Sequence, residues 1–161
     1  MRPHAILGPA AAIAIAALVA ACSGSAASPT AAPTAAPAAT QAASTVEVGV
    51  QEWAVVPASA STSAGSVTFN VKNTGPKDAH EMVVIKTDLA PEALPTKADG
   101  SIDEEGAGVT AMGEVEEVAV GTSKTVTIDL APGKYVLVCN VVDGDEIHYK
   151  LGMRTAFEVL P

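Results

Sequence analysis

Short alternating runs of β-branched residues, separated by turn residues, fill the chain from Thr45 to its end and constrain its fold most strongly. Residues 46–50 alternate valine with glutamate or glycine, and 66–72 alternate again before an Asn-Thr-Gly-Pro turn. A period of two residues is typical of a strand with one buried face. Many such strands, separated by turn signals, are typical of a β-sandwich or barrel. We therefore expect an all-β domain over residues 45–161, with further strands at 80–86, 115–120, 124–130, 134–141 and 155–160, of which 115–120 and 124–130 pair as a hairpin.

The N-terminal segment is predicted to be a lipoprotein signal peptide followed by a lipidated cysteine. Residues 1–21 have a short positive start and an almost wholly apolar run, which ends in small residues directly before Cys22. Small residues before a cysteine resemble the lipobox of bacterial lipoproteins, in which the thiol is lipidated before the signal peptide is cleaved. The apolar run is shorter than the roughly 20 residues of a spanning helix. A lipid on Cys22 would hold the chain on the extracytoplasmic side of a bacterial membrane; an uncleaved helix and a soluble secreted form are the alternatives.

Residues 22–44 are predicted to form a disordered linker. After Cys22 they contain only Ala, Ser, Thr, Pro, Gly and Gln, so no charged or aromatic side chain is present to drive burial. Such a composition is typical of a solvated tether. The tether would let the domain reach membrane-bound partners, or it would only lift the domain past lipid headgroups.

The last third of the domain carries sulfur and nitrogen side chains in a characteristic spacing. Cys139 ends an apolar run, His148 follows after eight intervening residues, and Met153 follows after four more. His80 lies far upstream, at the start of another apolar run. A histidine from a distant strand, with Cys, His and Met in one loop, resembles the cupredoxin (blue copper) family.

This resemblance implies a Greek-key β-sandwich or barrel with one copper ion held by His80, Cys139, His148 and Met153. A thiolate and two imidazoles with a weak axial thioether suit both Cu(I) and Cu(II). Two residues beside these ligands are candidates for supporting them. Gly152 would let the loop pass close to the metal, and Glu81 stands where many relatives have an asparagine that braces the loop.

The gap between Cys139 and His148 is longer than in many small carriers of the family and resembles the blue copper site of copper nitrite reductases. Those enzymes add a catalytic copper on further histidines, one of which directly precedes the cysteine, where this chain has Val138. The chain has three histidines, and His4 lies in the signal peptide. We therefore expect no enzyme, but a carrier of single electrons between redox partners. The alternatives are a module that buffers or delivers copper and a cupredoxin-like domain without metal.

The formal net charge of −9 bears on the partners. An acidic surface argues against nucleic acid and favours a redox partner with a basic docking face, although solubility alone also accounts for it. We expect the domain to be monomeric. The polar segment 88–112 is predicted to be a long loop with one helical turn at 91–94, for which Asp88 is a candidate N-cap. Met112 could approach the copper but is better explained by packing, and Trp53 is predicted to be a core residue.

Overall fold

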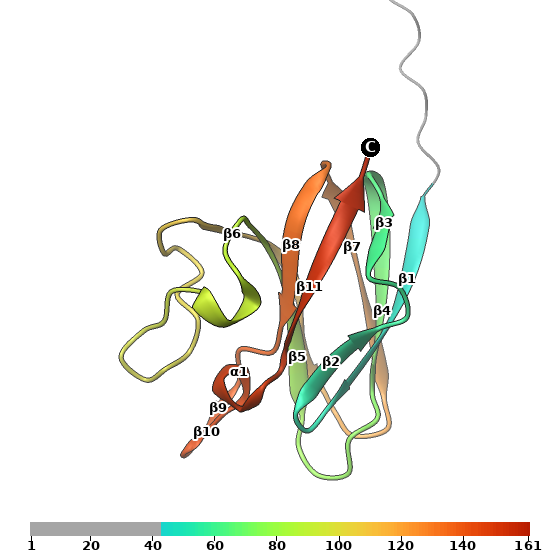
Figure 1. Ribbon diagram of the computed structural model, residues 1–161. Helices are drawn as coiled ribbons and strands as arrows, with labels where there is room; N and C mark the ends of the chain where they lie inside the picture. Colours follow the sequence, from blue (N-terminus) through green and yellow to red (C-terminus); the bar gives the residue numbers. More distant parts are fainter. Residues whose placement is uncertain (1–42) are drawn as a thin grey trace, which may run out of the picture. The chain divides into compact units, whose positions relative to one another are not determined.

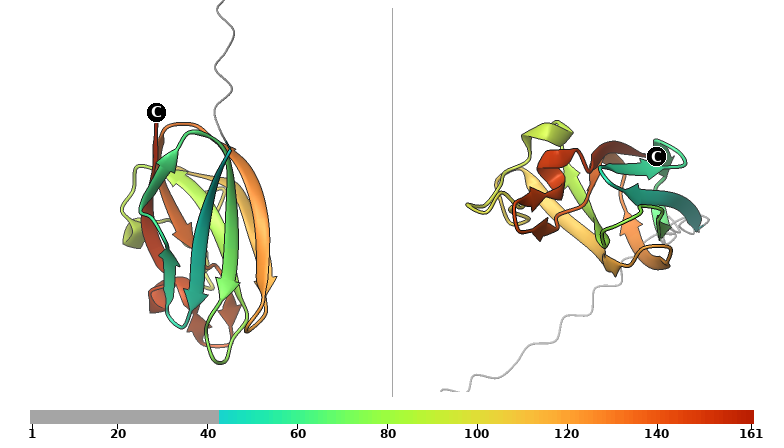
Figure 2. Two further views of the ribbon diagram at one scale, coloured as in Figure 1. Left: turned by 90° about the vertical axis from the view of Figure 1, so that its right-hand side faces the viewer. Right: turned by 90° about the horizontal axis from the view of Figure 1, so that it is seen from below.

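The computed structural model describes residues 43–161, which form two β-sheets packed face to face (Figures 1 and 2). The predicted signal peptide, the lipidated Cys22 and nearly all of the linker fall in residues 1–42 and lie outside the described residues. Within residues 43–161 no helix is long and apolar enough to span a membrane. The first strand begins at Ser44, one residue before the predicted start of the folded part. The prediction of an all-β domain is confirmed.

Nearly all regular elements are strands. They are β1 (Ser44–Gln51), β2 (Ala54–Pro57), β3 (Ser61–Ser63), β4 (Gly65–Asn73), β5 (His80–Thr87), β6 (Val109–Val118), β7 (Ser123–Leu130), β8 (Gly133–Val138), β9 (Val142–Asp143), β10 (Glu146–Ile147) and β11 (Arg154–Leu160), with a 3-10 turn η1 (Pro91–Ala93) and a short helix α1 (His148–Leu151).

One sheet has the strand order β2-β1-β4-β7 and the other the order β3-β11-β8-β5-β6, while β9 and β10 form a small separate hairpin. The pairs β1–β4 and β3–β11 are parallel, and the remaining pairs are antiparallel. In the second sheet, β8 lies between β11 and β5, so the strand that leads to Cys139 is central.

The hydrophobic core lies between the two sheets. Val46, Val48 and Val50 are buried on the inner face of β1, as the alternating sequence predicts. Phe69 of the first sheet meets Phe157 of the second with ring centroids 5.8 Å apart in an edge-to-face arrangement. Burying each such ring stabilises the fold by about 1.5–3 kcal/mol. The core therefore joins the sheets and holds their ends in a fixed relation.

The predicted hairpin of 115–120 and 124–130 is wrong. β6 pairs with β5, whereas β7 pairs with β4 in the other sheet, so the connection crosses between sheets. The turn is held by the end of β4: the Gly121 N–H donates to the carbonyl of Asn73, and the Asn73 N–H donates to the carbonyl of Thr122. The sequence contains a turn at the right place, but these tertiary bonds determine which strand each side joins.

The long polar loop is shorter than predicted and partly built into the fold. β6 begins at Val109, and Met112 lies within it, half-buried against the core. The helical turn is the 3-10 turn η1, which is preceded by Ala90 without a side-chain cap, so the N-cap role of Asp88 is wrong. The loop covers the outer face of β5 and β8 with a second apolar cluster, formed by Val83, Ile85, Leu94, Ile102, Val136, Val138 and Tyr149.

Candidate metal centre

Sheet register brings the cysteine and the first histidine together at one end of the sandwich. β8 and β5 are antiparallel neighbours in which Val138 is opposite Val83, so the end of β8 lies near the start of β5. His80 is the first residue of β5, and Cys139 directly follows β8. His148 opens α1 at the same end, beside the β9–β10 hairpin (Figure 1). Three segments far apart in sequence thus converge there.

The three side chains point their donor atoms at one another. The Nδ1 atoms of His80 and His148 are 3.2 Å apart, and Sγ of Cys139 lies 3.4 Å from Nδ1 of His148 and 4.0 Å from Nδ1 of His80. All three residues are fully buried. Within residues 43–161 this is the one group of His, Cys, Asp or Glu side chains close enough together to hold a metal ion.

The triangle of donor atoms has the size that a metal ion requires. In a triangle with these three sides every corner lies about 2.1 Å from the centre, and imidazole and thiolate ligands bind zinc, an ion of similar size, at about 2.0–2.3 Å. One thiolate and two imidazoles in a three-cornered arrangement form the donor set typical of blue copper sites. The residues therefore fit one copper ion.

Met153 belongs to the same loop. Its carbonyl accepts a hydrogen bond from the Cys139 N–H (2.9 Å), and its own N–H donates to the carbonyl of His148 (3.1 Å). The side chain is fully buried. These bonds fix the main chain of Met153 against two of the three donor residues, and its role as the axial thioether ligand stays a prediction.

The extra residues between Cys139 and His148 fold away from the cluster. They form the β9–β10 hairpin, with Gly144 in the left-handed region (φ 57°) at its turn. The His148 N–H donates to the carbonyl of Val141 (3.1 Å), which closes the base of the hairpin. The acidic insertion therefore lengthens the loop without separating the cysteine from the histidine.

Gly152 ends α1 with φ of 123°, a conformation that favours glycine. A Cβ at this position would lie 3.1 Å from the backbone oxygen of Trp53. The close approach that sequence predicted for Gly152 is thus made to the β1–β2 turn. This packing sets the path of the chain immediately before Met153.

Glu81 supports the cysteine with both its main chain and its side chain. Its N–H lies 3.5 Å from Sγ of Cys139 and donates to it, and its carboxylate accepts a hydrogen bond of 2.9 Å from the Asn140 N–H. Burial raises the pKa of Glu81 to about 7; the Asn140 bond opposes this, and Glu114 adds to it. Glu81 therefore contacts the segment that carries the thiol on both sides of the Cys139–Asn140 peptide.

Burial determines the protonation of the donor atoms. It raises the pKa of the Cys139 thiol to about 11. It lowers the pKa of His80 and of His148, and for His80 the neighbouring imidazole adds to the effect. Without a metal, the cluster is therefore a neutral thiol between two neutral imidazoles near pH 7, and metal binding must displace the thiol proton.

Two further residues support the site, both in the β1–β2 turn, and neither is predicted from the sequence to do so. The indole of Trp53, which is half-buried, meets the His148 ring edge-to-face with centroids 5.0 Å apart. Oε1 of Glu52 lies 3.7 Å from Nε2 of His80. The interpretation of Trp53 as a core residue holds in part, because it packs against the core cluster as well as the site. The sequence signal that could have indicated these two residues is the break in alternation at 51–53, where strand β1 ends.

The long loop also reaches the centre. The side chain of Asn140 donates to the carboxylate of Glu104 (2.9 Å) and to the carbonyl of Ile102 (3.3 Å). The hydroxyl of Tyr149 donates to the carbonyl of Pro91 and accepts from the Leu94 N–H. The loop is thus tied to the residues that follow Cys139 and His148.

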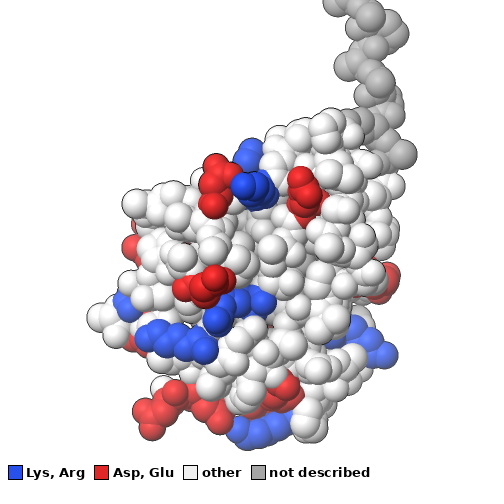
Figure 3. Space-filling model, viewed as in Figure 1, with Lys and Arg blue, Asp and Glu red and all other residues white. Residues whose placement is uncertain are grey.

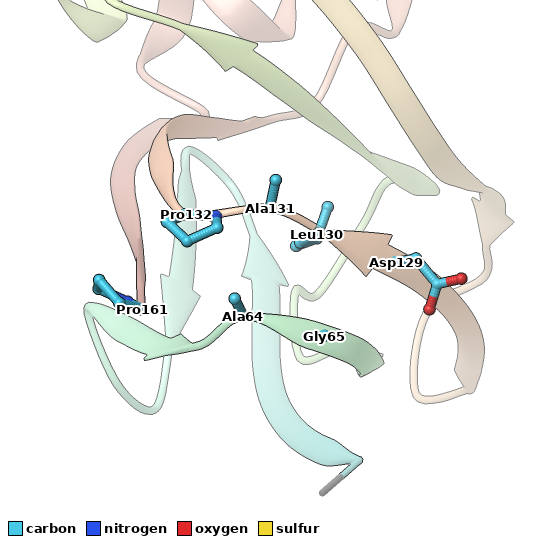
Figure 4. Close-up of a pocket in the computed structure, with 7 residues that line it drawn as sticks. All are labelled: Ala64, Gly65, Asp129, Leu130, Ala131, Pro132 and Pro161. Atoms are coloured by element: carbon cyan, nitrogen blue, oxygen red, sulfur yellow. The ribbon is translucent and has the colours of Figure 1, made fainter. Parts of the chain in front are cut away.

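Within residues 43–161, the opposite end of the sandwich offers no comparable chemistry. Figure 4 shows a hollow there, near the C-terminus, whose lining is mostly apolar and contains one ionisable side chain, Asp129. The remaining lining residues are Ala64, Gly65, Leu130, Ala131, Pro132 and Pro161. The donor cluster is therefore the strongest candidate for function in the described part of the chain.

Fold and site together define a cupredoxin-type β-sandwich with a buried His-Cys-His cluster. The structure is similar to reduced auracyanin from the photosynthetic bacterium Roseiflexus castenholzii, with 24% identity, a TM-score of 0.53, and coverage of 73% of this chain and 97% of that one. It is also similar to auracyanin A, a blue copper protein from Chloroflexus aurantiacus, with 23% identity, a TM-score of 0.50, and coverage of 73% of this chain and 99% of that one. No protein-family model and no curated protein sequence matches the chain. The likeness confirms the cupredoxin fold.

Proposed function

We propose that this chain is a blue copper protein that carries single electrons between redox partners. The observation that carries the proposal is the buried triangle of Nδ1 of His80, Nδ1 of His148 and Sγ of Cys139. Met153 would supply a thioether ligand in this proposal. A bound copper ion supplies a one-electron change between Cu(I) and Cu(II), both of which this donor set accepts.

The protein's own contribution is to hold the donors still and keep water out. Residues 83–86 of β5 pair with residues 135–138 of β8, so His80 and Cys139 are held at the same end of one sheet. Backbone hydrogen bonds fix Met153 to Cys139 and to His148. None of the four side chains is exposed to solvent. Rigid, dry ligands keep structural change small when an electron arrives or leaves, and they leave no open position for a substrate, as a carrier requires.

The alternative of copper delivery has less support. Delivery requires the ion to exchange with a partner, and a donor set buried on every side slows that exchange. The similar structure from Roseiflexus castenholzii is that of an auracyanin reduced with dithionite. Its fold likeness to this chain supports electron transfer.

We also propose that a lipid on Cys22 holds the protein on a bacterial membrane, outside the cytoplasm. The support is the run of small residues before that cysteine. A redox partner would dock by charge as well as shape. On the face seen in Figure 3, acidic and basic side chains are interspersed. We therefore propose that the net charge of the chain, rather than a single acidic patch, steers a partner with a basic docking face.

Optical spectroscopy of the purified full chain titrated with Cu(II) tests the function. We expect an intense blue colour from thiolate-to-copper charge transfer, at one copper per chain, with a reversible wave in voltammetry. Cys139→Ser should abolish the colour. Met153→Leu should keep the copper and raise the reduction potential, because the weak axial donor is lost.

A matched control uses the other cysteine. Cys22→Ser should leave the spectrum unchanged and move the protein from the membrane to the soluble fraction of cells. A colourless protein whose Cys139 thiol still reacts after copper addition would overturn the electron-carrier proposal. Rapid loss of Cu(I) to a chelator without a reversible wave would instead favour copper delivery.

A further inference from the structure

The far ring nitrogen of His80 has no hydrogen-bond partner. His80 directs Nδ1 at the donor cluster, so a neutral ring that binds metal through Nδ1 carries its proton on Nε2. This Nε2 is buried and unpaired. A buried N–H without an acceptor is unfavourable, and metal-binding histidines usually donate their second N–H to a carboxylate or carbonyl.

Among the described residues, the Glu52 carboxylate is the one that makes an ion-pair contact with this nitrogen. Its Oε1 lies 3.7 Å from Nε2 of His80, outside hydrogen-bond length but within reach of a small rotation. The side chain is 12% exposed. Its second oxygen, Oε2, is buried and has no partner. A donor and a carboxylate with unused acceptor capacity therefore face each other inside the protein.

Glu52 is held in this position by the loop that leads to His80. Its Oε1 accepts hydrogen bonds from the backbone N–H groups of Asp78 (2.7 Å) and Lys77 (3.1 Å). Gly75 leaves room for the carboxylate, since a Cβ there would lie 2.2 Å from Oε2. The side chain is thus clamped on the segment immediately before β5, and its contact with His80 does not depend on a free surface rotamer.

The Glu52 carboxylate accepts two backbone N–H bonds and donates none, as an ionised carboxylate does. A negative charge beside the ring makes the imidazole a stronger electron-pair donor to a metal. It also favours a doubly charged ion at the cluster over a singly charged one.

We propose that Glu52 is the positioning residue of His80: its carboxylate accepts the Nε2–H, fixes the tautomer that presents Nδ1 to the metal, and favours Cu(II) over Cu(I). This inference rests on the proposed copper site. The contact of 3.7 Å closes to a hydrogen bond when the metal is bound. The β1–β2 turn then supports both histidines, His80 through Glu52 and His148 through Trp53.

Two substitutions separate the charge from the acceptor. Glu52→Gln keeps an oxygen for His80 and for the 77–78 backbone but removes the charge. Glu52→Leu removes both. For Glu52→Gln we expect Cu(II) affinity to fall about tenfold or more relative to Cu(I) affinity, which corresponds to a rise of about 59 mV in reduction potential for each tenfold change.

The matched control is Glu47→Gln, on the β1 strand that leads into this turn, where the glutamate is exposed and bonded to Asn70. It should leave the potential unchanged. If Glu52→Gln destabilised the metal-free protein but shifted the potential no more than Glu47→Gln, then Glu52 would be a loop anchor only and the inference would be overturned.

Nitrogen NMR of the histidine rings in the metal-free protein tests the tautomer without copper. We expect His80 to carry its proton on Nε2 in the wild type and in Glu52→Gln, and to mix tautomers in Glu52→Leu. A wild-type His80 protonated on Nδ1 would overturn the inference. If the chain forms no blue site with copper, the proposed function fails, while the NMR result still decides the role of Glu52.

Discussion

The carboxylate of Glu81 accepts a hydrogen bond of 2.9 Å from the backbone N–H of Asn140, directly after the cysteine of the donor cluster. The same residue directs its own N–H at Sγ of Cys139. The sequence resemblance places Glu81 where many relatives have a bracing asparagine, and here the brace is a glutamate, a group that can titrate. Burial raises its pKa to about 7 from an ordinary 4.5. This has consequences for stability.

We expect the contribution of Glu81 to the stability of the metal-free protein to fall as the pH rises from about 4.5 to 7. Folded Glu81 holds its proton more tightly than unfolded Glu81, so its stabilising contribution is complete below pH 4.5 and is lost through pH 7. The shift corresponds to at most about 3 kcal/mol, and contact of the partly exposed carboxyl with water reduces this.

Denaturant unfolding of wild type and Glu81→Gln across that pH range measures the effect. Because other carboxyl groups titrate in both proteins, the difference between their free energies of unfolding isolates Glu81. The difference should vary with pH and level off above pH 7 and below pH 4.5. A constant difference would mean that Glu81 has an ordinary pKa.

Metal affinity should rise with pH because of Cys139. Its thiol pKa of about 11 means that the proton is displaced on binding, so apparent affinity should increase about tenfold per pH unit from pH 7 toward 11. The histidines contribute little in this range, since burial lowers their pKa. Competition with a chelator for Zn(II) at several pH values measures the slope. Cys139→Ala removes the titrating group. The variant should bind Zn(II) more weakly, and its affinity should no longer rise with pH.

Trp53 is the only tryptophan of the chain, and its ring meets the His148 ring at 5.0 Å. Its fluorescence should therefore report what the cluster binds. We expect Cu(II) to quench it strongly at one equivalent, because an excited indole next to an absorbing, oxidising ion loses its energy. Zn(II), which is neither coloured nor redox-active, should leave most of the emission. Equal quenching by both ions would place the indole elsewhere.

The fold and the donor set could be predicted from sequence because both rest on local signals. Alternating burial in β1 and the spacing of Cys139, His148 and Met153 are visible along the chain. The crossing between sheets after Val118 was not visible, because hydrogen bonds of the turn to Asn73 determine it. Glu52 and Trp53 were missed as site residues for the same reason, since their contacts join segments distant in sequence.

Gly152 combines φ of 123° with a close backbone neighbour. In Gly152→Ala the alanine would have a backbone conformation that L residues rarely adopt. Its Cβ would lie 3.1 Å from the Trp53 carbonyl oxygen. We expect a loss of about 1–3 kcal/mol in the free energy of unfolding, together with a shift of the copper band, because Met153 follows directly. Gly121→Ala is the matched control. Gly121 has φ of 75° with nothing within 4 Å of the added Cβ, so the variant should lose stability through backbone strain but keep the wild-type spectrum. If both variants kept that spectrum, the contact between Gly152 and Trp53 would have no part in shaping the centre.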